Sequence, residues 1–145
     1  LKKEFIIFHK NRSSLYGYHI NRRLFLNQKG KDEKLVQDYF VGENLLSVNL
    51  RSYPNILKLD DGFLLIVDQF GVYRIDGLLS PKVLLTQSPK INLERLIRYL
   101  KPSEIIADGS NYKSYQNHWR TVCKQFGVPF YTTSESGAYH YNLID

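Results

Sequence analysis

The hydrophobic positions of the chain fall into short runs separated by polar turns. In the first part of the sequence, residues 4–9, 15–20 and 24–26 are mainly apolar and are joined by turns containing Asn, Arg and Ser. This spacing predicts three short strands in an antiparallel meander. Side chains alternate along the middle strand, so we expect one covered face and one wetter face.

The middle of the chain is predicted to hold one helix and several strands. Apolar residues recur at helical spacing over residues 31–40, and Gly42 ends the helix. The strands are expected over residues 45–50, 56–59, 63–67 and 72–75. Asp60-Asp61-Gly62 is a strong hairpin signal. The fully apolar run Phe63–Val67 is typical of a buried strand.

The last half alternates strands with helices. Strands are predicted over residues 83–85, 104–107, 128–131 and 138–143. Between them, Asn92 is expected to cap a helix that Pro102 stops, and Gly127 ends a second helix. The buried face of the second helix is predicted to carry Tyr112, Tyr115, Trp119, Val122, Cys123 and Phe126. Strand, loop, helix and strand in this order indicate a parallel sheet.

Polar residues follow the predicted parallel strands. Right-handed crossovers bring the carboxyl ends of such strands to one edge, so we expect a polar rim there. Its members are Asp68, Gln87, Ser88, Asp108, Ser110 and Asn111. An anion could bind the Asp108–Asn111 loop at the start of the helix. The simpler explanation, which we favour, is that Ser110 or Asn111 caps the helix and Gly109 permits the turn.

Composition predicts one packed globular domain. The chain has 145 residues, of which 43% are hydrophobic and 14% aromatic. It opens with Leu1 and contains no Met, so we expect a segment of a longer protein. Its single cysteine, Cys123, excludes an internal disulfide and is expected in the core rather than as a nucleophile. No apolar run approaches the length of a membrane span.

The net charge of +6 is concentrated in the first part of the chain. Residues 1–60 carry eleven Lys and Arg against six Asp and Glu. This excess is compatible with a polyanionic partner or an anionic membrane surface. The simpler explanation, which we favour, is ordinary solvated Lys and Arg.

Motifs for catalysis are absent. The four histidines are scattered, and HxHxDH, CxxC, HExxH, Walker A and GxGxxG patterns do not occur. A triad of Ser110, His118 and Asp108 lacks a supporting G-x-S-x-G elbow. His9 and His19 have no partner at ligand spacing and are expected to be structural. We therefore predict no metal, no other cofactor and no catalytic residue.

The residues from Val83 to Tyr139, with the segment DGSNYKSYQNHWRTVCKQFGVPFYTTSESGAY, resemble the C-terminal end of ComEC-family competence proteins of the Bacteroidota type. The opening EFIIFHKNRSSLYGYHINRRLFLN is similar to the start of the same domain. ComEC is the inner-membrane channel through which one DNA strand enters the cell in natural transformation. In many members this terminal region is a metallo-β-lactamase-like αββα sandwich proposed to degrade the other strand.

The sequence departs from the metal-binding pattern of that family. The HxHxDH motif has no counterpart, and the family's S-H-H-G-S falls on Thr86–Pro89, which contains no histidine. Asp68 matches the Asp that ends the family's T-G-D strand, and Gly137 and Ala138 match its final G-A. The resemblance thus implies an α/β fold with mixed sheets: a truncated, degenerate sandwich in which the polar rim is a vestigial site.

From the resemblance we expect residues 1–145 to be one soluble domain of an inner-membrane DNA-uptake protein, on the extracytoplasmic side. The expected role is non-catalytic: contacting single- or double-stranded DNA without sequence preference, or packing against the channel part of the same polypeptide or other competence proteins. The candidate phosphate contacts are Lys10, Arg12, Arg22, Arg23, Lys113 and Arg120. The alternative is a metal-dependent nuclease or phosphodiesterase that uses Asp68, Asp108 and a third ligand outside the family pattern.

Overall fold

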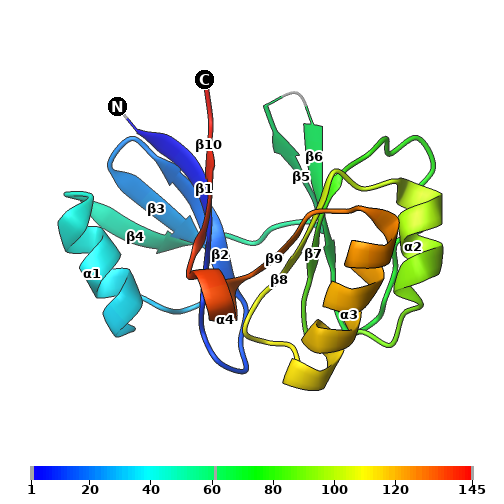
Figure 1. The fold of residues 1–145 in the computed structure, drawn as a ribbon. Coiled ribbons are helices and arrows are strands. Elements are labelled where there is room, and N and C mark those ends of the chain that lie inside the picture. Colours follow the sequence, from blue (N-terminus) through cyan, green and yellow to red (C-terminus); the bar gives the residue numbers. More distant parts are fainter. Residues whose placement is uncertain (1, 61, 145) are drawn as a thin grey trace.

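Two five-stranded sheets face each other, and helices cover the outer side of each sheet (Figure 1). The computed structural model describes residues 2–60 and 62–144. From one side to the other, the layers are helix α1, the first sheet, the second sheet, and helices α2 and α3. The predicted αββα layering is thus confirmed, and both sheets are mixed.

The first sheet has the strand order β10-β1-β2-β3-β4. Its strands are β1 (Lys3–Phe8), β2 (Leu15–Ile20), β3 (Arg23–Leu26), β4 (Ser47–Leu50) and β10 (Tyr139–Asn142). β1, β2 and β3 form the expected antiparallel meander, and β10 pairs antiparallel with β1. Helix α1 (Lys34–Gly42) connects β3 to β4, which is therefore parallel to β3.

The second sheet has the strand order β5-β6-β7-β8-β9. Its strands are β5 (Ile56–Leu59), β6 (Gly62–Val67), β7 (Lys82–Leu85), β8 (Glu104–Ala107) and β9 (Phe130–Thr132). β5 and β6 form a hairpin, although Asp61 of the predicted turn lies outside the described residues, and β6 to β9 are parallel. Helices α2 (Leu93–Leu100) and α3 (Lys113–Phe126) make the crossovers.

Hydrophobic side chains fill all three interfaces between layers. Phe5 and Ile7 of β1 pack between the sheets against Leu84 and Ile106 of the second sheet. Separate clusters hold α1 on the first sheet and α2 with α3 on the second. Because fully burying one such side chain stabilises a fold by about 1.5–3 kcal/mol, the layers depend on these positions.

The helices of the second sheet largely follow the sequence prediction. The Asn92 side chain accepts a hydrogen bond from the Arg95 N–H and caps α2. Cys123 is buried in α3, and burial raises the pKa of its thiol to about 12, so it is a core residue. The prediction for Tyr112 was wrong: it precedes α3 at the N-cap position and its side chain is 69% exposed.

Other differences have clear packing causes. Residues 72–75 form no strand; Tyr73 and Ile75 instead pack against the cluster below α2 and α3. The middle strand β2 has the expected covered and wetter faces: α1 covers the side on which His19 is buried, and Tyr18 and Ile20 on the other side are half-buried. The polar turn after β9 contains the four-residue helix α4 (Thr133–Ser136). Within the described ranges, no helix has the length and apolar character that crossing a bilayer requires.

Among the glycines of the first sheet, Gly17 is predicted to be the one whose replacement destabilises the protein most. A Cβ at this position would overlap the backbone carbonyl oxygen of Phe25 in β3. We expect Gly17→Ala to lower the free energy of unfolding in urea by at least about 1–3 kcal/mol, the range for overpacked cores.

Gly42→Ala is the matched control for this prediction. No atom lies within 4 Å of a Cβ at Gly42, the last residue of α1. Alanine there should leave stability unchanged or raise it by up to about 1 kcal/mol. Equal losses in both variants would contradict the proposed steric cause.

Candidate functional site

A polar cleft of about 1150 Å³ opens at one end of the sandwich, where the β1–β2 loop meets the carboxyl ends of β6, β7 and β8. Val67 pairs with Leu85, and Leu85 with Ala107, so the residue after each strand reaches the same edge. Most predicted rim residues line this cleft: Asp68, Gln87, Ser88, Ser110 and Asn111. The sixth, Asp108, is completely buried beside them.

Asp108 organises the loop between β8 and α3. Its Oδ1 accepts hydrogen bonds from the Ser110 N–H at 3.1 Å and the Ser110 hydroxyl at 2.5 Å. Oδ1 also lies 3.4 Å from Nδ2 of Asn111. Oδ2 is buried without a hydrogen-bond partner. Burial therefore dominates and raises the pKa of this carboxyl, although the bonds from Ser110 and the nearby Ser14 hydroxyl and His9 oppose the shift.

The loop after β7 is tied to the same network. Gln87 and Ser88 both have positive φ, at 61° and 47°. In this conformation the Gln87 N–H donates to the Ser110 hydroxyl oxygen at 2.8 Å, and the Ser88 N–H donates to Oδ1 of Asn111 at 2.9 Å. Two N–H groups that could bind an anion are thus occupied by side chains of the protein.

Neither Ser110 nor Asn111 caps helix α3, so that expectation was wrong. The N-cap residue is Tyr112, whose backbone N–H donates to the Ser88 hydroxyl at 2.8 Å. Ser110 and Asn111 are used between loops instead, because the adjacent β7 loop presents its N–H groups to them. Nδ2 of Asn111 also donates to the Leu85 carbonyl at 2.7 Å.

The β1–β2 loop from the first sheet closes the floor of the cleft. The Arg12 N–H donates to the Gly109 carbonyl at 2.8 Å, and the Ser14 hydroxyl donates to the Ser110 hydroxyl at 3.1 Å. A Cβ on Gly109 would overlap the Lys10 carbonyl oxygen. Gly109 therefore permits close approach of two backbones, as well as the turn for which the sequence suggested it.

Sequence reasoning missed several contacts at this site. Nδ1 of His9, which was expected to be structural, is hydrogen-bonded to the Thr133 hydroxyl at 2.9 Å beside the Asp108 loop. Ser14 was read only as part of a turn, and Tyr112 as a core residue. Each is placed by contacts between the two sheets or between neighbouring loops, which no local pattern indicates. The signal available for Tyr112 was its position immediately before the helix.

The six candidate basic residues do not form one surface. Arg12 and Lys113 line the cleft, are exposed, and make no ion pair with a described carboxylate. Lys10 pairs with Glu33 at 2.6 Å, and Arg120 pairs with Glu135 in a smaller adjoining cavity. Arg22 lies in the β2–β3 connection and Arg23 begins β3, at the opposite end of the sandwich.

Asp68 and Asp108 do not form a metal site with a third ligand. In residues 2–60 and 62–144, the one group of three candidate ligand residues is Glu4, His19 and Glu43. His118, which the sequence offered as the histidine of a triad with Ser110 and Asp108, is exposed on α3. Among the described residues, the cleft rim therefore does not bring three candidate ligand residues together.

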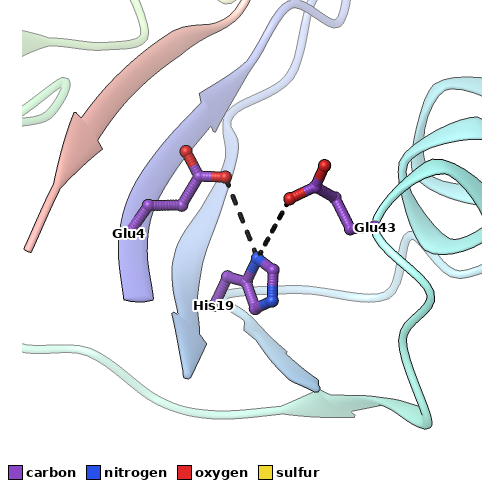
Figure 2. Close-up of side chains that lie close together, drawn as sticks. All are labelled: Glu4, His19 and Glu43. Atoms are coloured by element: carbon purple, nitrogen blue, oxygen red, sulfur yellow. Dashed lines mark ion pairs between the residues drawn. The ribbon is translucent and has the colours of Figure 1, made fainter. Parts of the chain in front are cut away.

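The Glu4, His19 and Glu43 group lies between the first sheet and α1, away from the cleft (Figure 2). His19 Nδ1 is 3.8 Å from Glu4 and 4.0 Å from Glu43. The Lys2 ammonium already pairs with these carboxylates at 3.3 and 2.7 Å. Burial opposes ionisation of Glu4, but hydrogen bonds from Tyr39 and His140 outweigh it and lower its pKa.

The raised pKa of Asp108 predicts a pH-dependent cost in stability. The folded state holds this proton more tightly than the unfolded chain, so the stability contributed by the group falls as pH rises above the ordinary value of 3.8. Relative to wild type, Asp108→Asn should gain about 1.4 kcal/mol per unit of pKa shift between about pH 3.5 and pH 7. Urea titrations across this range measure the difference.

Asp32→Asn is the control for that experiment, since it removes one exposed carboxylate outside the network. A stability difference between Asp108→Asn and wild type that stays constant with pH, or moves in favour of wild type, would contradict the assignment.

Comparison with known proteins places the chain in a family. No curated protein and no solved structure matches it. The model of the family described as "ComEC C-terminal domain" matches residues 5–143, which include the whole cleft and both sheets except the first two residues of β1. ComEC is a membrane protein of competence and DNA uptake. The chain belongs to the ComEC C-terminal domain family.

Proposed function

We propose that this domain is a non-catalytic DNA-contacting part of a competence channel and that the cleft at the end of the sandwich is its contact site. The observation that carries the proposal is a pair of exposed cations, Arg12 and Lys113, which both line the cleft and pair with no described carboxylate. Membership in a family concerned with DNA uptake supplies the polyanion. Cationic side chains beside phosphates provide most of the affinity in sequence-independent binding.

The remaining lining of the cleft suits a nucleic acid backbone. Amides and hydroxyls dominate, including Asn11, Ser13, Asn27 and Asn55. Asp68 is the one carboxylate among the described lining residues, and its Oδ1 accepts the Phe70 N–H at 3.0 Å. Polar groups of this kind bind phosphate and sugar without reading sequence.

Tyr112 adds a surface for an unpaired base. Its ring lies at the cleft beside Lys113 and is 69% exposed. Tyr115 contacts the ring edge-on, with centroids 5.7 Å apart, and this contact restricts its orientation. An exposed aromatic next to a phosphate-binding cation is the usual arrangement in proteins that bind single strands. We therefore expect single-stranded DNA to be preferred.

The proposal of a non-catalytic role rests on the donor atoms at the rim. Thr86, Gln87 and Ser88 stand where a metal-binding family member has histidines. Oδ1 of Asp108 is already engaged by Ser110 and Asn111, and the carboxylate is buried. These residues hold the loops together and leave no ligand set for hydrolytic chemistry among the described residues.

The same proposal includes the type of sandwich, the parent protein and the location of the domain. We take the domain to be a degenerate metallo-β-lactamase-like sandwich of the Bacteroidota type, formed by residues 1–145 of a longer inner-membrane protein. On this view it is a soluble domain on the extracytoplasmic side, and its partners are DNA, the channel part of the same polypeptide and other competence proteins.

Loss of the two cleft cations should weaken DNA binding. For Arg12→Gln/Lys113→Gln, we expect the salt dependence of log K for a fluorescent single-stranded oligonucleotide to become shallower by about 1.4, which is about 0.7 for each lost phosphate contact. Fluorescence anisotropy at several salt concentrations measures this slope.

Lys101→Gln/Lys124→Gln is the matched control, because it removes the same charge at exposed positions near the ends of α2 and α3. Equal weakening of DNA binding in both double variants, or no DNA binding by wild type, would contradict the proposal. DNA cleavage with Mn²⁺ or Zn²⁺ that Asp68→Asn abolishes would replace it with the nuclease alternative.

Tyr112→Ala should weaken the binding of single-stranded DNA more than the binding of duplex DNA. Loss of one stacked base costs about 1–3 kcal/mol, so affinity for a single strand should fall by roughly fivefold to 150-fold. Duplex affinity should change little, because paired bases are not available for stacking. Tyr99→Ala, at a half-exposed position on α2, is the control. Parallel losses for both DNA forms would contradict a stacking role.

A further inference from the structure

A second basic surface lies at the end of the sandwich opposite the cleft. It comprises two adjoining grooves of about 530 Å³ each, which share Ile20 and Arg51. We call it the basic end face and define it by Lys3, Arg22, Arg23, Arg51 and Lys58. β1 begins and β10 ends at this end, and the β2–β3 connection lies there too (Figure 1).

The cations of the basic end face lack the ion pairs seen elsewhere. None of the five pairs with a described carboxylate, whereas Lys2, Lys10, Lys82 and Arg120 all do. Of the described acids nearby, Asp60 accepts the Ile144 N–H and Glu43 pairs with Lys2. Among the described residues, five cations without an ion pair therefore gather at this end.

Two of the arginines are held in place by the fold. The Arg51 guanidinium lies over the Phe25 ring, 4.1 Å from its centroid. Nε of Arg22 donates to the Asn44 carbonyl at 2.9 Å. A guanidinium fixed at one edge keeps its other donors available for an anionic group.

Exposed aliphatic side chains accompany these charges. Leu46 lines the groove with Arg22 and Arg23 and is 63% exposed. Val41, in the last turn of α1, is 78% exposed, and its carbonyl accepts the N–H of Asn44, the residue that holds Arg22. A DNA backbone offers nothing to bury an aliphatic side chain. The boundary between lipid head groups and acyl chains does.

We propose that the basic end face docks on the surface of an anionic phospholipid bilayer. Arg22, Arg23 and Lys58 contact lipid phosphates, and Leu46 enters the interfacial layer. The domain then stands with its cleft facing away from the membrane. This inference uses the fact that ComEC is a membrane protein, and it does not depend on DNA binding at the cleft.

The test is co-sedimentation of the chain with vesicles of phosphatidylglycerol and phosphatidylcholine, or of phosphatidylcholine alone. We expect binding to the anionic vesicles alone, weakening as salt is raised. Each Lys or Arg near such a surface contributes about fivefold, so Arg22→Gln/Arg23→Gln/Lys58→Gln should lose about a hundredfold in partition coefficient. Arg12→Gln/Lys113→Gln/Lys124→Gln, with the same charge change, should retain binding.

The apolar contribution has its own pair of variants. Leu46→Ser should weaken vesicle binding several-fold, while Phe70→Ser should not. Phe70 is 78% exposed but follows Asp68 at the cleft end. Thermal unfolding midpoints of all variants show whether they remain folded, and the dependence of wild-type binding on salt and phosphatidylglycerol content tests the proposal without any substitution.

Three outcomes overturn the proposal. The first is no wild-type binding to anionic vesicles. The second is equal binding losses in the two triple variants, which would show that net charge alone matters. The third is loss of oligonucleotide binding, but not vesicle binding, in the Arg22, Arg23 and Lys58 variant, which would make this end a DNA surface. If vesicle binding follows the prediction while Arg12 and Lys113 prove irrelevant to DNA, the membrane proposal stands and the cleft proposal fails.

Discussion

The arrangement of the cleft depends on a backbone contact between the two sheets. Gly109 lies so close to the Lys10 carbonyl that a side chain cannot fit, and its own carbonyl accepts the Arg12 N–H at 2.8 Å. Ser14 extends this contact to Ser110. Because these bonds fix the β1–β2 loop against the second sheet, the Arg12 side chain faces the same cleft as Lys113. A cationic cleft therefore follows from a glycine and a backbone hydrogen bond.

The parts of this molecule that could be predicted from sequence are those set by local pattern. The strand Glu104–Ala107 and the αL glycine Gly127 follow from apolar period and helix-ending chemistry. The rim was predictable because parallel strands end together. The pairing of His9 with Thr133, 124 positions apart, was not. It depends on how one sheet faces the other, which no segment encodes alone.

The positions of the basic residues show the same limit. Arg12 and Arg22 are ten positions apart in sequence and look like one basic region. A six-residue strand, β2, separates their turns, and at about 3.3 Å per residue it places them about 20 Å apart. Ion pairs also distinguish basic residues that look equivalent in the sequence, since Glu33 neutralises Lys10 but not Arg12. The net charge of the first sixty residues therefore divides between two ends of the sandwich.

Asp108 explains how the loops at the rim are held in place. A buried carboxylate needs a cation or several donors to offset its desolvation. Here Ser110 and Asn111 supply donors to one oxygen, and the other has no partner, so the pKa of the carboxyl rises. The same bonds hold the β7 and β8 loops together. A rim fixed in this way suits binding, because Arg12 and Lys113 can meet a strand with little reorganisation of the loops that carry them.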